Sequence, residues 1–204
     1  MPHNKTPQQI WDSLKEGNKR FTGEAAEHPH SSMKRLQELQ SGQEPIAVIL
    51  SCSDSRAPVE YIFDTGFGDL FVVRTAGETV APAVFGSIEF AVKNLDVGLI
   101  IVLGHESCGA VSAAIKAVDH AEVPVDSQRV LVEKIIPSVL QSRVKGGTDP
   151  AAIEAEHASI TADQIIHRLS VVGDRLEMGE IGVVAAHYRL SDGQVESVRT
   201  WGVS

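Results

Sequence analysis

The two cysteines of this chain lie in motifs whose side chains could bind a metal ion. Cys52 begins the sequence Cys-Ser-Asp-Ser-Arg, and Cys108 ends the sequence His105-Glu-Ser-Cys. Thiolates and imidazoles are common zinc ligands in proteins. If the two motifs meet, they supply three ligands and leave a fourth position open, which is typical of a catalytic zinc site rather than a structural one.

A carboxylate and a guanidinium accompany the first cysteine. Water at an open zinc position has a pKa of about 7, so such a site supplies hydroxide at neutral pH. Asp54 could accept the proton of that water and orient it, while Arg56 could hold Asp54 in a bidentate ion pair. Without the pair, Asp54 could become the fourth ligand and close the site, so the pair could also act as a switch.

Both motifs directly follow apolar runs, at 46–51 and 99–103, that are typical of buried strands. Active sites of parallel α/β sheets lie beyond the carboxyl ends of the strands, so the two motifs are expected to meet there. Ser107 is a suitable N-cap for a helix whose first turn contains Cys108. The amino end of that helix would favour the thiolate form of the cysteine.

The rest of the chain alternates between strand and helix patterns, which predicts an α/β fold with a mostly parallel sheet of about four to five strands flanked by helices. A turn at 191–193 predicts a hairpin at the carboxyl-terminal edge of the sheet. We expect a single domain over 1–204, with an N-terminal helical arm at 1–42 and an α/β core at 43–204. Further strands are expected at 70–73, 181–185 and 195–198, and helices at 7–21, 33–40, 58–63, 82–94, 108–118, 127–144 and 150–172.

Composition excludes several classes of function. The formal net charge of −9 opposes binding to nucleic acid, and no apolar run approaches the roughly 20 residues of a membrane helix. The amino terminus has no apolar segment of a secretory signal. Two cysteines do not make a disulfide framework, so we expect a cytoplasmic protein.

Taken together, Cys52-Ser-Asp-Ser-Arg56 and Gly104-His-Glu-Ser-Cys-Gly109 resemble the paired motifs of the β-class carbonic anhydrases. The likeness covers most of the chain and includes Gly17-Asn-Lys-Arg-Phe21 and Phe71-Val-Val-Arg74. It implies reversible hydration of carbon dioxide to bicarbonate and a proton, by attack of zinc hydroxide on CO2. It also implies one Zn²⁺ per chain and a homodimer or a dimer of dimers.

The resemblance also implies roles for individual residues. Cys52, His105 and Cys108 match the zinc ligands of the family, and Asp54 and Arg56 match its catalytic dyad. In a closed state of the site, Asp54 would be the fourth ligand.

The substrate site implied by the family comprises Gln43, Phe71, Ala76 and Phe90. Gln43 would bind the substrate from the neighbouring subunit, and the others would line an apolar CO2 pocket. The chain departs from plant-like members at Phe90, where they carry a tyrosine, and Glu78 adds a charge to the segment after Arg74.

Other functions remain open on the sequence. Relatives with the same scaffold hydrolyse carbon disulfide or carbonyl sulfide, and a zinc-binding protein without turnover would need the same ligands. A thiol redox protein would instead pair Cys52 with Cys108, but the chain has no Cys-x-x-Cys motif. His120, His157 and His167 are expected on helix surfaces.

Overall fold

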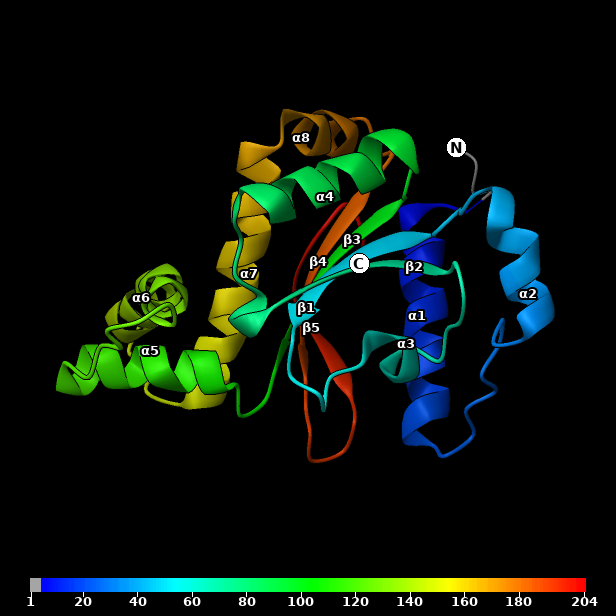
Figure 1. Cartoon of the computed structure of the whole chain (residues 1–204). Helices are drawn as coiled ribbons and strands as arrows, with labels where there is room; N and C mark the ends of the chain where they lie inside the picture. The colour runs from blue at the N-terminus through cyan, green and yellow to red at the C-terminus, as the bar shows by residue number, and fades with distance from the viewer. Residues whose placement is uncertain (1–4) are drawn as a thin grey trace.

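A five-stranded sheet in the order β2-β1-β3-β4-β5 forms the centre of the computed structural model, which describes residues 5–204 (Figure 1). The strands are β1 Ala47–Cys52, β2 Leu70–Thr75, β3 Leu99–His105, β4 Gly182–Tyr188 and β5 Val195–Trp201. The first four run parallel, and β5 pairs antiparallel with β4 at the edge. The predicted α/β class is therefore confirmed.

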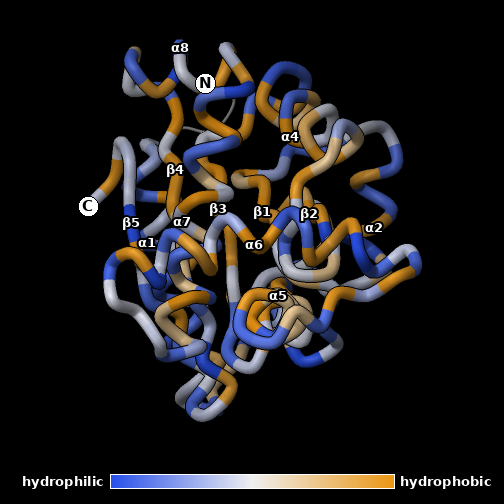
Figure 2. Tube along the Cα trace, turned by 90° about the vertical axis from the view of Figure 1, so that its left-hand side faces the viewer, coloured by the Kyte–Doolittle hydropathy of each residue, from blue (hydrophilic) through white to orange (hydrophobic). Residues whose placement is uncertain are grey.

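Helices cover both faces of the sheet, which explains why every residue of β1, β3 and β4 is buried. One face packs against α4 Pro82–Asn94, α7 Pro150–Arg168 and α8 Ser170–Glu177, and the other against α1 Pro7–Thr22 and α3 Val59–Ile62. Figure 2 shows the apolar residues gathered along the central strands. The apolar runs that do not alternate with polar residues are therefore strands buried on both faces of the sheet.

The N-terminal helices differ in how they pack. A capping box formed by Thr6 and Gln9 begins α1, which buries Ile10, Trp11 and Leu14 against the sheet of its own chain. By contrast, α2 Met33–Glu38, continued by the 3₁₀ turn η1 Leu39–Ser41, buries no residue and lies at the side of the molecule (Figure 1). Residues 1–4 of the expected arm lie outside the described residues.

Two helices, α5 Gly109–His120 and α6 Arg129–Val144, pack on each other beside the sheet (Figure 1). They form a third apolar cluster that includes both cysteines. A short 3₁₀ turn, η2 Ala76–Glu78, follows β2 and contacts β1, β3, α5 and α6. These elements enclose the carboxyl ends of β1 and β3.

The prediction of one helix over 150–172 is wrong, because the chain is extended at Leu169 (φ −106°, ψ 95°) and divides into α7 and α8. Leu169 at this break and Val172 in α8 are both buried in the core. His157 is also not on the surface, since it is 3% exposed. No helix of the described residues is long and apolar enough to cross a membrane.

Candidate metal centre

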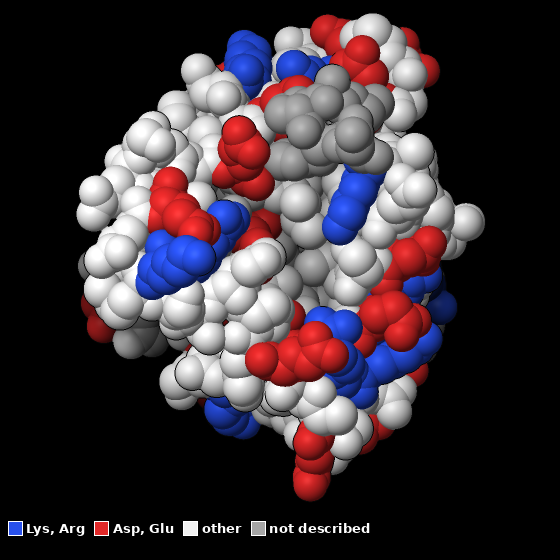
Figure 3. All heavy atoms as spheres, turned by 90° about the vertical axis from the view of Figure 1, so that its right-hand side faces the viewer, with Lys and Arg blue, Asp and Glu red and all other residues white. Residues whose placement is uncertain are grey.

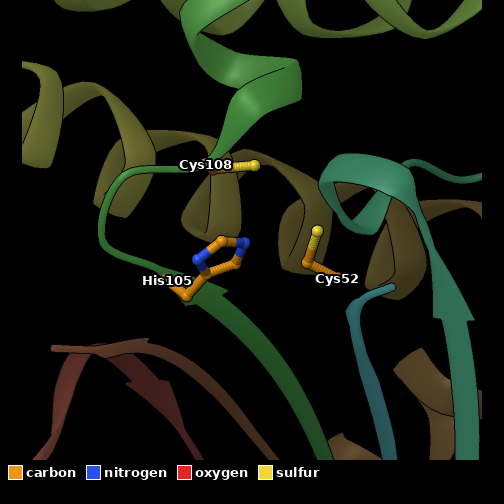
Figure 4. Close-up of side chains that lie close together, drawn as sticks. All are labelled: Cys52, His105 and Cys108. Atoms are coloured by element: carbon orange, nitrogen blue, oxygen red, sulfur yellow. The ribbon is translucent and has the colours of Figure 1, made fainter. Parts of the chain in front are cut away.

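The three predicted ligands meet at one point. Cys52 ends β1, His105 ends β3, and Cys108 caps the amino end of α5. Since β1 and β3 are parallel, hydrogen-bonded neighbours, with Ser51 paired to Leu103, their carboxyl ends lie close together. The three side chains point into a common space (Figure 4), and their ligand atoms all lie within 4.8 Å of one another. The predicted convergence of the two motifs is confirmed.

This donor set fits a zinc ion. In a tetrahedral zinc site the ligand atoms lie about 3.5–4 Å apart, so small side-chain shifts would complete the geometry. His105 Nδ1 lies 2.8 Å from the carbonyl oxygen of Glu106 and donates to it, which leaves a lone pair on Nε2. That Nε2 atom is buried and has no hydrogen-bond partner among the described residues. Both cysteines are free thiols.

The charges within the group are coupled. Contact with Cys108 lowers the pKa of Cys52 and raises the pKa of Cys108, because the two sulfurs share one proton. Burial alone would lower the pKa of His105, but the neighbouring Cys52 outweighs burial and raises it. The lowered pKa of Cys52 favours its thiolate, which is the form that a metal needs.

Backbone hydrogen bonds and a buried carboxyl group hold the two cysteines in position. The Gly77 N–H donates to Cys52 Sγ at 3.3 Å, and the Cys108 N–H donates to Glu154 Oε1 at 2.9 Å. The other oxygen of Glu154 lies 3.2 Å from His187 Nε2. These hydrogen bonds were not predicted from the sequence. Glu154 lies on α7, one residue after the buried Ile153.

The predicted start of the helix after β3 is wrong by one residue. Ser107 has φ of +58° and does not cap α5; Cys108 itself is the N-cap, and Gly109 is the first helical residue. The Cys108 side chain makes no capping hydrogen bond, so its sulfur stays available to a metal. The Cys108 N–H is bonded to Glu154 instead, which fixes the position of the backbone.

Asp54 and Arg56 form the predicted bidentate pair. Arg56 Nε donates to Asp54 Oδ1 at 2.9 Å, and Nη2 donates to Oδ2 at 2.8 Å. Arg74, which the sequence did not assign to this loop, donates to the carbonyl oxygens of Cys52 and Asp54 at 3.0 and 2.6 Å. The Arg56 hydrogen bonds hold the pKa of Asp54 well below its usual range. Asp54 Oδ2 lies 4.0 Å from His105 Nε2, so an ionised carboxylate faces the predicted metal ligands.

The predicted substrate residues are more dispersed. Phe71 on β2 and Phe90 on α4 have ring centroids 6.1 Å apart, and Phe90 is 46% exposed. Ala76 directly precedes Gly77 in η2. Gln43 is exposed and precedes β1, so the strand, about 17 Å long, separates it from Cys52. Gln43 therefore lies apart from Cys52, His105 and Cys108 of its own chain.

Glu78 is almost completely buried next to the group of Cys52, His105 and Cys108. Neither of its carboxyl oxygens has a hydrogen-bond partner in the described part of the chain. Burial, together with the negative charge of Cys52, raises the pKa of Glu78 to about 8. The carboxyl group thus favours its neutral form at pH 7 and does not add the charge expected from the sequence.

The chain is similar to known proteins over nearly its whole length. A sequence model described as carbonic anhydrase matches residues 47–195. A carbonic anhydrase of Mycolicibacterium smegmatis is 44% identical over 193 residues, which cover 95% of this chain and 94% of the relative.

Solved structures share the fold. A Coccomyxa β-carbonic anhydrase in complex with acetazolamide has a TM-score of 0.73 at 20% identity, covering 93% of this chain and 87% of its own. One of two tetrameric β-carbonic anhydrases from Sordaria macrospora has a TM-score of 0.70 at 20% identity, with coverage of 92% and 95%.

Proposed function

The chain belongs to the β-class carbonic anhydrase family, and on this premise we propose that it hydrates carbon dioxide reversibly to bicarbonate with one zinc ion per chain. The observation that carries the proposal is the group of Cys52, His105 and Cys108. In it a buried imidazole nitrogen has no hydrogen-bond partner among residues 5–204, and two thiols converge on that nitrogen. No other arrangement of the described residues offers such a set of ligands.

Cys52, His105 and Cys108 would hold the zinc ion. Zinc bound there supplies a nucleophile at neutral pH, because it lowers the pKa of water from 15.7 to about 7. Asp54 Oδ2, at 4.0 Å from His105 Nε2, is placed to accept a hydrogen bond from the nucleophile and to orient it. A low pKa keeps Asp54 ionised for this role at neutral pH.

Two arginines keep Asp54 in place. The side chain of Arg56 binds both carboxylate oxygens, and that of Arg74 binds the backbone on either side of Ser53. Together they oppose a movement of Asp54 towards the position that the substrate needs. In this proposal the open state depends on these hydrogen bonds, and loss of the Arg56 contacts would permit Asp54 to become a fourth ligand.

The substrate would bind at an interface between two chains. Phe71 and Ala76 would provide apolar contacts for CO2, with Phe90 packed against Phe71, and Gln43 of a second chain would bind the bicarbonate oxygen. The distance of Gln43 from the ligands of its own chain supports this arrangement, as does the tetrameric assembly named for the Sordaria protein. We infer a homodimer or a dimer of dimers.

Two further aspects follow from the surface and the thiols. Acidic and basic side chains lie interspersed on the face in Figure 3, without a large positive area that would attract nucleic acid.

Both cysteines must stay reduced to bind a metal, which supports a cytoplasmic location. Fractionation of cells that express the tagged protein would test that location.

The first experiment is stopped-flow CO2 hydration from pH 7 to 9, with the zinc content measured on the same sample. We expect about one zinc per chain and a hydration rate that rises with pH. Stoichiometric zinc without hydration at any of these pH values would contradict the proposed reaction, and absence of zinc from the purified protein would contradict the proposed metal.

A further inference from the structure

His157 on α7 is a buried histidine that the proposed reaction does not use. Its ring is 3% exposed and makes two hydrogen bonds, to groups far apart in the sequence. Nδ1 lies 2.8 Å from Ser138 Oγ on α6, and Nε2 lies 2.8 Å from the carbonyl oxygen of Gly77 in η2. A carbonyl can only accept, so Nε2 carries the proton and Nδ1 accepts from the serine hydroxyl. Burial lowers the pKa of His157, which agrees with this neutral form.

Gly77 connects this histidine to the metal centre. Its carbonyl accepts from His157, while its N–H donates to Cys52 Sγ at 3.3 Å. Its φ of +64° is a left-handed conformation that favours glycine. A Cβ atom at this position would lie 2.8 Å from Ala110 Cβ and 2.9 Å from Ile135 Cδ1, so α5 and α6 close on the residue. The orientation of the Gly77 backbone thus depends on the residues packed around it.

Hydrogen bonds to a metal-bound sulfur orient the ligand and stabilise its negative charge. The Gly77 N–H is a backbone donor to Cys52 Sγ that comes from a different strand connection than the cysteine itself. Because Gly77 is a glycine, its φ and ψ angles can change readily unless its own carbonyl is held. The His157 ring provides such a restraint from α7, through its hydrogen bond to the Gly77 carbonyl.

We propose that His157 is a positioning residue for the metal centre, which holds the Gly77 carbonyl and thereby keeps the Gly77 N–H directed at Cys52 Sγ. Ser138 completes the arrangement, because its hydroxyl fixes the ring tautomer that donates from Nε2. The inference rests on the proposed role of Cys52 as a metal ligand. It assigns a function in metal binding to a residue that never contacts the metal or the substrate.

The test compares three variants of the full-length protein. His157→Leu removes the donor, and His157→Gln retains an amide N–H near the position of Nε2. Ile165→Val is the matched control, because Ile165 is a buried residue of the same helix in another part of the core. A hollow of about 210 Å³ beside His157, lined in part by Pro137 and Thr161, gives a replacement side chain room to settle.

The measurements are zinc affinity by competition with a chelator and the thiolate-to-metal charge-transfer band of the Co²⁺-substituted protein. We expect His157→Leu to weaken zinc binding by roughly tenfold, within the range typical of outer-shell partners, and to shift the band. We expect His157→Gln to bind zinc within about threefold of the wild-type protein. Ile165→Val should lower the melting temperature and leave both metal readouts unchanged.

Unchanged zinc affinity and an unchanged cobalt band in His157→Leu would overturn the inference. If that variant fails to fold, Ser138→Ala provides the second test, and we expect a smaller loss of zinc affinity in the same direction; no loss would overturn the inference. Wild-type protein that binds zinc but does not hydrate CO2 would refute the proposed function and leave this inference standing. Wild-type protein that binds no zinc would refute both.

Discussion

Replacing Glu154 by alanine should destabilise the protein and leave the position of Cys108 less restrained. Glu154 is 2% exposed and accepts the Cys108 N–H at 2.9 Å, at a residue that is itself 1% exposed. Water cannot readily replace the lost acceptor there. A buried donor that loses its partner costs about 1–3 kcal/mol. Loss of the His187 contact and of buried volume adds to this, so we expect a total of about 2–4 kcal/mol.

A protein of this size loses about 2–4 °C in melting temperature per kcal/mol, so Glu154→Ala should melt about 4–16 °C below the wild-type protein. Glu154→Gln is the matched control. Its amide oxygen can still accept the Cys108 N–H, and we expect it to lose about 1 kcal/mol or less. The assay is calorimetric unfolding of both variants, together with chelator competition for zinc.

The reasoning on Glu154 would be refuted if the alanine variant melted within about 2 °C of the wild-type protein. It would also be refuted if the glutamine and alanine variants were destabilised equally, because the loss would then come from the charge rather than from the missing acceptor. Weaker zinc binding in Glu154→Ala alone would link the acceptor to the position of Cys108.

Asp54→Asn should retain zinc but lose at least about 100-fold in CO2 hydration, because the amide cannot replace the ionised acceptor; near-normal rates with full zinc would exclude this role. Because the folded-state pKa of Asp54 is lowered, its contribution to stability is fully present above about pH 4 and is lost as the pH falls further. The stability difference between wild type and Asp54→Asn in urea unfolding should therefore be constant from pH 7 to about pH 5 and shrink in stronger acid; growth of the difference in acid would contradict this sign. Arg56→Ala should free Asp54, and a crystal structure of the zinc-bound variant should show the carboxylate closer to the metal; an unmoved Asp54 would rule out the switch. Gln43→Ala and Asp54→Asn should each be nearly inactive alone, yet their mixed dimer should regain about half of the wild-type activity per dimer, because one site then contains both native residues. If mixing restores nothing, Gln43 does not act across an interface.

The position of the metal ligands could be predicted from the sequence because the apolar runs before Cys52 and His105 carry no polar residue. Such runs form strands buried on both sides, and parallel strands place their carboxyl ends together. The bidentate pair of Asp54 and Arg56 was also predictable, because two residues in one tight loop cannot lie far apart. These inferences needed only local sequence.

The supports of the site were not predictable in the same way. The hydrogen bond of Glu154 to Cys108 and that of His157 to Gly77 join residues 46 and 80 positions apart, and they depend on where α7 crosses the sheet. A signal for burial was present, since His157 follows Ile153 by four residues on the apolar stripe of the helix. Only the packing of α6 and η2 shows what the ring binds.

The helix break at Leu169 had only a weak local signal. Neither proline nor glycine lies at this position, although Ser170, Val171 and Val172 after it are weak helix formers. The chain leaves the helix there because Leu169 and Val172 are both buried against the core. Tertiary packing thus determines the backbone where local propensity is weak and does not fix the position of the break.

The position of β2 at the sheet edge affects how readily a chain aggregates before it assembles. Four consecutive apolar residues, Leu70–Val73, form the outermost strand, and in a lone chain such an edge is a template for aggregation. The charge that follows does not protect the edge, because the Arg74 side chain is turned to the carbonyls of Cys52 and Asp54. We expect newly made chains to need rapid covering of this strand, so that recovery of soluble protein on refolding falls as the protein concentration in the refolding mixture rises.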